Sequence, residues 1–204
     1  ILVAPLYPQY CSATTGSVMD EVYKSVSAMH APPALRMLPP YYDDPAYIET
    51  MNRLIQTHLD GLDWAPEALL LSFHGLPQTF VDRGEPYRDH CEATAGEIRQ
   101  EFKDRFDCMP IVFQSRSRHV VWTGPELEDV LEELAKSGVR RVCVATPGFA
   151  ADCLETIEEV GLRAADHFRA KGGEHFSRVP CPEAHPMAIQ MLASLATREL
   201  KSWI

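Results

Sequence analysis

A short apolar run that ends in a histidine constrains the fold of this chain more than any other feature. Residues 68–73 have the sequence Ala-Leu-Leu-Leu-Ser-Phe, His74 follows, and Gly75 and Pro77 interrupt the pattern. Such a run between turn residues is typical of a strand buried on both faces in a parallel sheet. His74 is then expected at the carboxyl end of a strand, where open α/β sheets bind ligands. It is a candidate base or metal ligand, and the alternative is a core histidine bonded to a neighbouring loop.

The whole chain alternates strand-like runs with helical patterns. This alternation predicts an α/β fold, with a parallel sheet covered by helices on both faces, and one domain over residues 1–204. The clearest helix is expected to begin at Pro125 and to end just before Gly138. A last helix is expected over residues 185–200. The strand-like runs lie near residues 1–5, 34–38, 67–73, 109–114 and 141–146.

A second segment brings polar residues to the same predicted edge. The apolar run at 141–146 is followed closely by an acidic helical pattern that starts near residue 150. Its apolar positions at helical spacing are Leu154, Ile157, Gly161, Ala164 and Phe168. Its acids Asp152, Glu155, Glu159 and Asp166 cluster roughly opposite that stripe, so they are expected to face water or a cleft. The alternative is an ordinary solvated helix face whose acids complement the helix dipole.

Composition excludes several classes of partner. The chain has 19 basic and 29 acidic residues and a net charge of −10. Nucleic acid is not expected as a partner, because phosphate neutralisation needs clustered Lys and Arg. Strong binding to anionic lipid is not expected either, and no apolar run approaches the roughly 18 residues that span a bilayer. The six cysteines form no Cys-x-x-Cys pair, which favours reduced thiols and a cytoplasmic location.

Several motifs together resemble the ferrochelatase family. The two strongest are Leu-Ser-Phe-His-Gly-Leu-Pro-Gln at 71–78, followed by Val-Asp-Arg-Gly-Glu-Pro-Tyr at 81–87, and Pro-Gly-Phe-Ala-Ala-Asp-Cys-Leu-Glu-Thr-Ile-Glu-Glu at 147–159. Three further stretches agree in order and spacing, at 5–16, 113–116 and 122–125. The resemblance therefore runs nearly from end to end of the chain.

The resemblance implies an enzyme of haem biosynthesis that inserts ferrous iron into protoporphyrin IX. Iron and porphyrin are then substrates, with no prosthetic group. It maps the family's site pair onto His74 and Glu155. A neutral imidazole, with an ordinary pKa of about 6.5, can accept a pyrrole proton or bind Fe²⁺, and carboxylates offer oxygen ligands. We assign His74 as the principal proton acceptor, which can also bind the metal, Glu155 as metal ligand and proton relay, and Glu159 as its support.

Four further residues are candidates for porphyrin binding. Trp122 is expected against the macrocycle face, with a core anchor as its alternative. Arg116, with Ser115 and the neighbouring Arg118, is expected near the propionates, and the alternative is an exposed loop that meets only water. The chain departs from its relatives here, because many have Phe-Gly after Gln-Ser-Arg. Tyr10 is expected near the cleft, or in a purely structural position.

The resemblance also implies what this chain does not contain. Ferrochelatases have two similar α/β halves around the porphyrin, and the 204 residues match mainly the carboxyl-terminal one, so the amino-terminal half is expected to be absent. The isolated chain is therefore expected to be weakly active or inactive, with any peripheral membrane contact in the missing half. No iron–sulfur cluster is expected, since no cysteine-rich tail follows Trp203. Two alternatives stay open: another chelatase, such as one inserting cobalt into sirohydrochlorin, and a non-catalytic porphyrin-binding module.

Overall fold

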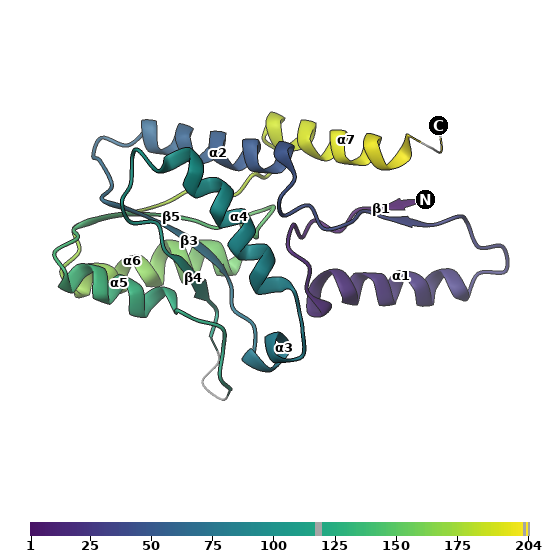
Figure 1. Cartoon of the computed structure of the whole chain (residues 1–204), viewed down its shortest axis with the longest axis horizontal. Coiled ribbons are helices and arrows are strands. Elements are labelled where there is room, and N and C mark those ends of the chain that lie inside the picture. Colours follow the sequence, from purple (N-terminus) through teal and green to yellow (C-terminus); the bar gives the residue numbers. More distant parts are fainter. Residues whose placement is uncertain (117–119, 202, 204) are drawn as a thin grey trace.

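The chain folds around a four-stranded parallel sheet, as the sequence predicts (Figure 1). The computed structural model describes residues 1–116, 120–201 and 203. The strand order is β4-β3-β5-β6, with β3 and β5 at the centre. The strands are β3 (Ala68–His74), β4 (Ile111–Gln114), β5 (Arg141–Ala145) and β6 (His175–Arg178).

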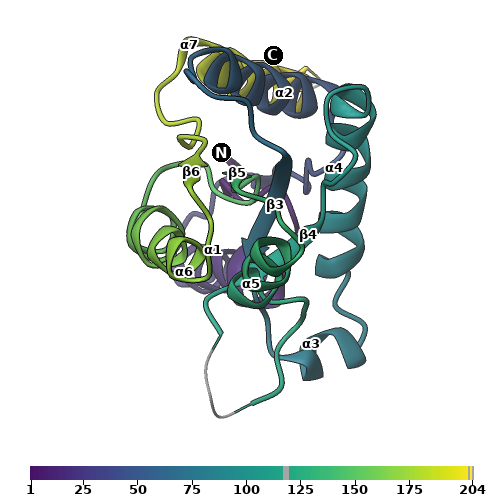
Figure 2. The ribbon, with the colours of Figure 1, turned by 90° about the vertical axis from the view of Figure 1, so that its left-hand side faces the viewer.

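Helices cover both faces of this sheet (Figure 2). Because successive side chains of a strand point to opposite faces, Leu69, Leu71 and Phe73 of β3 pack with α2, α4 and α7, whereas Ala68 and Leu70 pack with α5, η2 and α6. All of these side chains are fully buried, which explains the unbroken apolar run of β3. The helices are α2 (Pro45–Asp60), α3 (Gln78–Asp82), α4 (Tyr87–Phe102), α5 (Leu127–Lys136), the π-helix η2 (Glu155–Ala164), α6 (Ala165–Ala170) and α7 (Pro186–Leu200).

The first forty residues contribute a second, two-stranded sheet and pack against the main core through Leu2, Cys11 and Leu38. Strands β1 (Leu2–Val3) and β2 (Arg36–Met37) pair in parallel as a sheet of their own, and the π-helix η1 (Ser12–Gly16) and helix α1 (Ser17–Ser27) connect them. Figure 1 shows α1 and β1 together at one end of the molecule. The expected strands near 1–5 and 34–38 are thus present, but they do not join the main sheet. The assignment of residues 1–204 to one domain remains a prediction.

The expected start of one helix was wrong, and β6 was missed. Helix α5 begins at Leu127 and not at Pro125, because the Pro125 carbonyl accepts a hydrogen bond of 2.8 Å from the N–H of Phe113 and so belongs to the edge of β4. Gly138 does follow the helix end, at φ +99°, a conformation that favours glycine. Strand β6 has the sequence His-Phe-Ser-Arg, which lacks an apolar run, since it lies at the edge of the sheet.

The helix after β5 also differs from its predicted pattern. It begins as a π-helix at Glu155, and Leu154 and Ile157 are 72% and 50% exposed, although helical spacing placed them on the buried stripe. A π-helix bonds residue i to i+5, so its turns are wider and the spacing of an α-helix does not hold. Thr156 and Val160 are buried in their place, and Ala164 and Phe168 are buried as expected.

Candidate functional site

His74 lies at the carboxyl end of β3, where the sequence placed it. Its ring nitrogen Nδ1 lies 2.6 Å from the carbonyl oxygen of Gly75. A carbonyl only accepts hydrogen bonds, so Nδ1 carries the proton. In the neutral ring the lone pair is then on Nε2, the nitrogen that can accept a proton or bind a metal.

Gly75 is required for this strand end. A Cβ atom at this position would lie 2.8 Å from the carbonyl oxygen of Gln114 and 3.1 Å from Cε3 of Trp122. The Gly75 N–H also donates to that Gln114 carbonyl, at 2.8 Å. The chain therefore leaves β3 in close contact with the end of β4, and a side chain at residue 75 would force the two apart.

His74 and Glu155 line one cavity, of about 710 Å³. One side of it is largely apolar and comes from the first eighteen residues and from the 148–151 loop, including Val3, Leu6, Val18 and Phe149. The polar side chains are those of Tyr7, Gln9, Thr14, His74, Tyr87, Cys153 and Glu155. The two predicted site residues thus share an opening at the sheet edge, although 81 positions separate them in the sequence.

The environment of Glu155 favours its charged form. Hydrogen bonds from the Cys153 side chain and from its own backbone N–H, together with the charge of a protonated His74, hold the pKa of the carboxyl below its ordinary value of 4.5. These effects outweigh partial burial, which raises the pKa. At neutral pH the cavity therefore contains a carboxylate near an imidazole.

Glu159 lies in a different cavity, of about 270 Å³, one helical turn from Glu155. It accepts a hydrogen bond from the Ser115 hydroxyl and lies 3.3 Å from Nη2 of Arg163. Arg116 also lines this smaller cavity and is paired with Glu126 at 2.6 Å. The structure thus brings Ser115, Arg116 and Glu159 together, but apart from the cavity of His74.

Trp122 and Tyr10 do not line the large cavity in the described part of the chain. Trp122 packs against Gly75, with its ring centre 6.5 Å from that of His74, which is the position of an anchor for the strand end. The backbone N–H of Tyr10 donates to Nδ1 of His90 on α4. Porphyrin binding by either residue remains a prediction, and Arg118 lies outside the described residues.

Among the polar residues of the large cavity that sequence reasoning missed are Tyr87 and Cys153. Both stand inside the motifs that carry the family resemblance. The Tyr87 hydroxyl donates a hydrogen bond of 3.0 Å to the carbonyl of His74. The side chain of Cys153 forms a hydrogen bond with the carboxylate of Glu155. Their position inside these motifs could have singled them out. Neither residue, however, stands at a sequence spacing from another polar residue that indicates a catalytic or metal site.

Asp152 does not face the cavity as a free acid. Its two carboxylate oxygens accept hydrogen bonds from Arg178 of β6 at 2.6 and 3.0 Å, and both side chains are largely buried. Burial raises the pKa of Asp152, but the bonds from Arg178 and the contacts with Cys181 and Thr156 more than offset it, so the pKa lies below its ordinary value of 3.8. The hydrogen bonds between Asp152 and Arg178 therefore hold the start of η2 against the edge strand β6.

We expect Asp152→Asn to lower the free energy of unfolding by about 2–3 kcal/mol, because it leaves Arg178 partly buried without its partner. Since the folded pKa is depressed, the contribution of the pair is present above pH 3.8 and is lost as the pH falls through the folded pKa. Urea unfolding at several pH values measures both effects. Asp166→Asn is the matched control, because the Asp166–Arg169 pair is exposed, and a similar loss in both variants would contradict the assignment.

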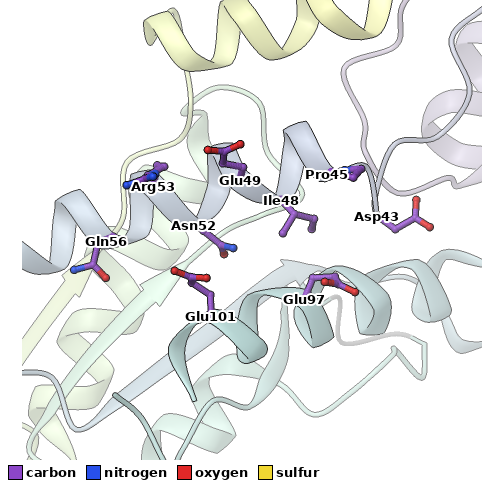
Figure 3. A pocket seen from close by; sticks show the side chains of 9 residues that line it. All are labelled: Asp43, Pro45, Ile48, Glu49, Asn52, Arg53, Gln56, Glu97 and Glu101. Atoms are coloured by element: carbon purple, nitrogen blue, oxygen red, sulfur yellow. The ribbon is translucent and has the colours of Figure 1, made fainter. Parts of the chain in front are cut away.

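A separate polar groove of about 520 Å³ lies between α2 and α4 (Figure 3). It is lined by the acids Asp43, Glu49, Glu97 and Glu101 and by the base Arg53. No group of three or more potential metal ligands is close enough to hold an ion anywhere in the described ranges. Nor is any helix of residues 1–116, 120–201 and 203 long and apolar enough to cross a membrane. Of the predicted site residues, the cavity of about 710 Å³ contains His74 and Glu155.

Comparison with known proteins finds relatives over the whole length of this chain. The family model described as Ferrochelatase matches residues 1–200. Ferrochelatases of Bradyrhizobium diazoefficiens, Nitrobacter hamburgensis and Rhizobium meliloti are 45%, 44% and 43% identical to the chain over all 204 residues. These matches cover 100% of this chain but only 59–60% of the relatives, so the chain spans about three fifths of their length.

Two solved structures share the fold. SirB from Bacillus subtilis with Fe³⁺ matches 99% of this chain and 72% of its own, with a TM-score of 0.68 and 14% identity. CbiX, described as the terminal enzyme for the biosynthesis of sirohaem in denitrifying bacteria, matches 97% of this chain and 74% of its own, with a TM-score of 0.63 and 16% identity. At these identities the likeness concerns the fold alone.

Proposed function

Since the chain belongs to the ferrochelatase family, we propose that it provides the His74–Glu155 wall of a site that inserts ferrous iron into protoporphyrin IX. One observation carries the proposal: an imidazole with its Nε2 lone pair free and a carboxylate held in its charged form line one cavity at the carboxyl edge of the sheet. The six unpaired cysteines support a reducing location such as the cytoplasm.

The reaction needs a base and transient metal ligands. Two pyrrole N–H protons leave the porphyrin as Fe²⁺ enters, and the four ring nitrogens replace the ligands of the ion. We assign Nε2 of His74 as the acceptor of the pyrrole protons, because Nδ1 is already engaged by the Gly75 carbonyl. Glu155 is then a metal ligand that also passes protons outward, since it remains ionised at neutral pH.

The apolar side of the cavity suits a flat hydrophobic macrocycle. Leu6, Val18 and Phe149 would contact the ring, while the polar side chains meet its nitrogen-bearing centre. This division supports a common opening for the substrate and the reacting groups, which efficient proton transfer requires.

A chimeric protein tests the proposal. In it, these 204 residues replace the matching segment of the Bradyrhizobium diazoefficiens relative, which supplies the remaining length. We expect the chimera to insert Fe²⁺, or Zn²⁺ as a stable substitute, into protoporphyrin. A folded chimera that quenches protoporphyrin fluorescence without metallation would favour a binding module, and cobalt insertion into sirohydrochlorin would favour another chelatase.

The 204 residues alone are expected to bind protoporphyrin weakly and to insert little metal. The relatives are longer by about two fifths of their length, and a cavity that is open on one side cannot grip or bend the macrocycle. The measurement compares Zn²⁺ insertion by the chain and by the chimera at equal concentration. Similar rates for the two proteins would show that the chain contains the complete site.

A further inference from the structure

We propose that Tyr87 is a positioning residue for His74, an inference that rests on the function proposed above. Tyr87 is the first residue of α4, its side chain lines the same cavity, and it is only 7% exposed. Its hydroxyl donates a hydrogen bond of 3.0 Å to the backbone carbonyl of His74. Through this bond Tyr87 contacts the backbone of the histidine, and we expect it to act on the ring by that route.

The peptide group between His74 and Gly75 is held at both ends. Its carbonyl accepts from Tyr87, and its N–H donates to the Gln114 carbonyl at 2.8 Å. The carbonyl of Gly75 belongs to the next peptide group, whose N–H, that of Leu76, donates to the Thr123 hydroxyl at 2.9 Å, so Tyr87 holds the backbone on one side of Gly75 and Thr123 holds it on the other. The Gly75 carbonyl accepts a hydrogen bond from the Nδ1–H group of His74. By holding the backbone that leads to this carbonyl, the hydroxyl of Tyr87 helps to keep the imidazole in one orientation and one tautomer.

Helix α4 gives the hydroxyl a rigid support. Tyr87 continues the stripe by which this helix packs into the core, a stripe formed by Cys91, Ala95, Ile98 and Phe102. These residues recur at helical spacing and are at most 2% exposed. A tyrosine has only two side-chain torsions, so its hydroxyl is placed accurately once the helix is packed. Loss of the hydroxyl alone would release the strand end without removing the helix from the core.

The first experiment reads the tautomer of His74 by ¹⁵N NMR of the 204-residue chain at pH 8, where an ordinary imidazole is neutral. We expect the native chain to carry the proton on Nδ1. In Tyr87→Phe we expect the Nε2-protonated form to increase about five- to tenfold, the effect of losing one hydrogen bond. Tyr47→Phe is the control, because it loses an equally buried hydroxyl that donates to the Pro147 carbonyl at 2.7 Å.

The NMR result does not depend on catalysis, so it separates this inference from the proposed function. Unchanged His74 signals in a folded Tyr87→Phe variant would overturn it, as would an equal change in Tyr47→Phe. If Tyr87→Phe does not fold, p-aminophenylalanine at position 87 offers a donor in nearly the same place. We expect this residue to restore the native tautomer, and failure to do so in a folded protein also counts against the inference.

In the chimera, Tyr87→Phe is expected to lower kcat about five- to tenfold and to leave KM for protoporphyrin within about twofold. A residue that only positions the reacting group affects kcat, whereas the affinity for the macrocycle, and with it KM, stays nearly the same. A change in KM with normal kcat would mean that Tyr87 contacts the substrate instead.

Discussion

His74→Ala is expected to lower the rate of metal insertion by the chimera by about two to four orders of magnitude, the usual contribution of a general base. The substitution removes the Nε2 lone pair from the cavity, and no other imidazole lines it among the described residues. Steady-state assays with Zn²⁺ and protoporphyrin give the loss in kcat, and protoporphyrin fluorescence gives the affinity, which we expect to change much less.

His175→Ala provides the matched control. His175 is an exposed histidine at the amino end of β6. The strands are parallel, so it lies at the amino ends of the strands, whereas His74 lies at their carboxyl ends. Its removal is expected to leave the rate unchanged. Added imidazole is expected to restore part of the activity of His74→Ala, because a free base can enter the space left by the ring. If His74→Ala keeps a near-native rate of metal insertion, His74 is not the general base.

The site pair could be predicted because one structural rule places both residues. The apolar run of β3 marks a buried strand, and β5 marks its neighbour, with Leu71 paired to Ala145. In a parallel sheet the segments that follow both strands meet at the carboxyl edge. His74 is the last residue of the first strand and Glu155 begins the helix after the second, so their shared cavity follows from the topology.

The rest of the site depends on details that local pattern does not contain. The π-helical turns of η2 change which side chains are buried, so Ile157 is exposed where an α-helix would bury it. The partner of Asp152 is Arg178, 26 positions away on a strand that the pattern missed. Tyr87 is recognised only by its contact with the His74 carbonyl. These are tertiary contacts, and sequence periodicity reports only the side that an element buries.

The sequence assigned Glu159 to support Glu155, and the structure gives the two acids different surroundings. Glu155 lines the cavity of His74 with its pKa lowered, whereas Glu159 lines the smaller cavity and is engaged by Ser115 and Arg163. The charge of Glu159 is therefore already balanced within its own cavity. We therefore expect Glu159 to contribute much less than Glu155 to binding the metal ion.

We therefore expect Glu155→Gln to lower metal insertion by the chimera about a hundredfold or more, because an amide can neither carry a proton nor offer a charged oxygen to Fe²⁺. Glu159→Gln should lower it about fivefold or less, since an ion pair with one half-exposed partner, here Arg163, contributes about 0–1 kcal/mol. Both substitutions preserve side-chain size and helix η2, so each is the control for the other. Equal losses in the two variants would mean that the acids act as one track across both cavities, and a normal rate in Glu155→Gln would leave His74 without its proposed partner.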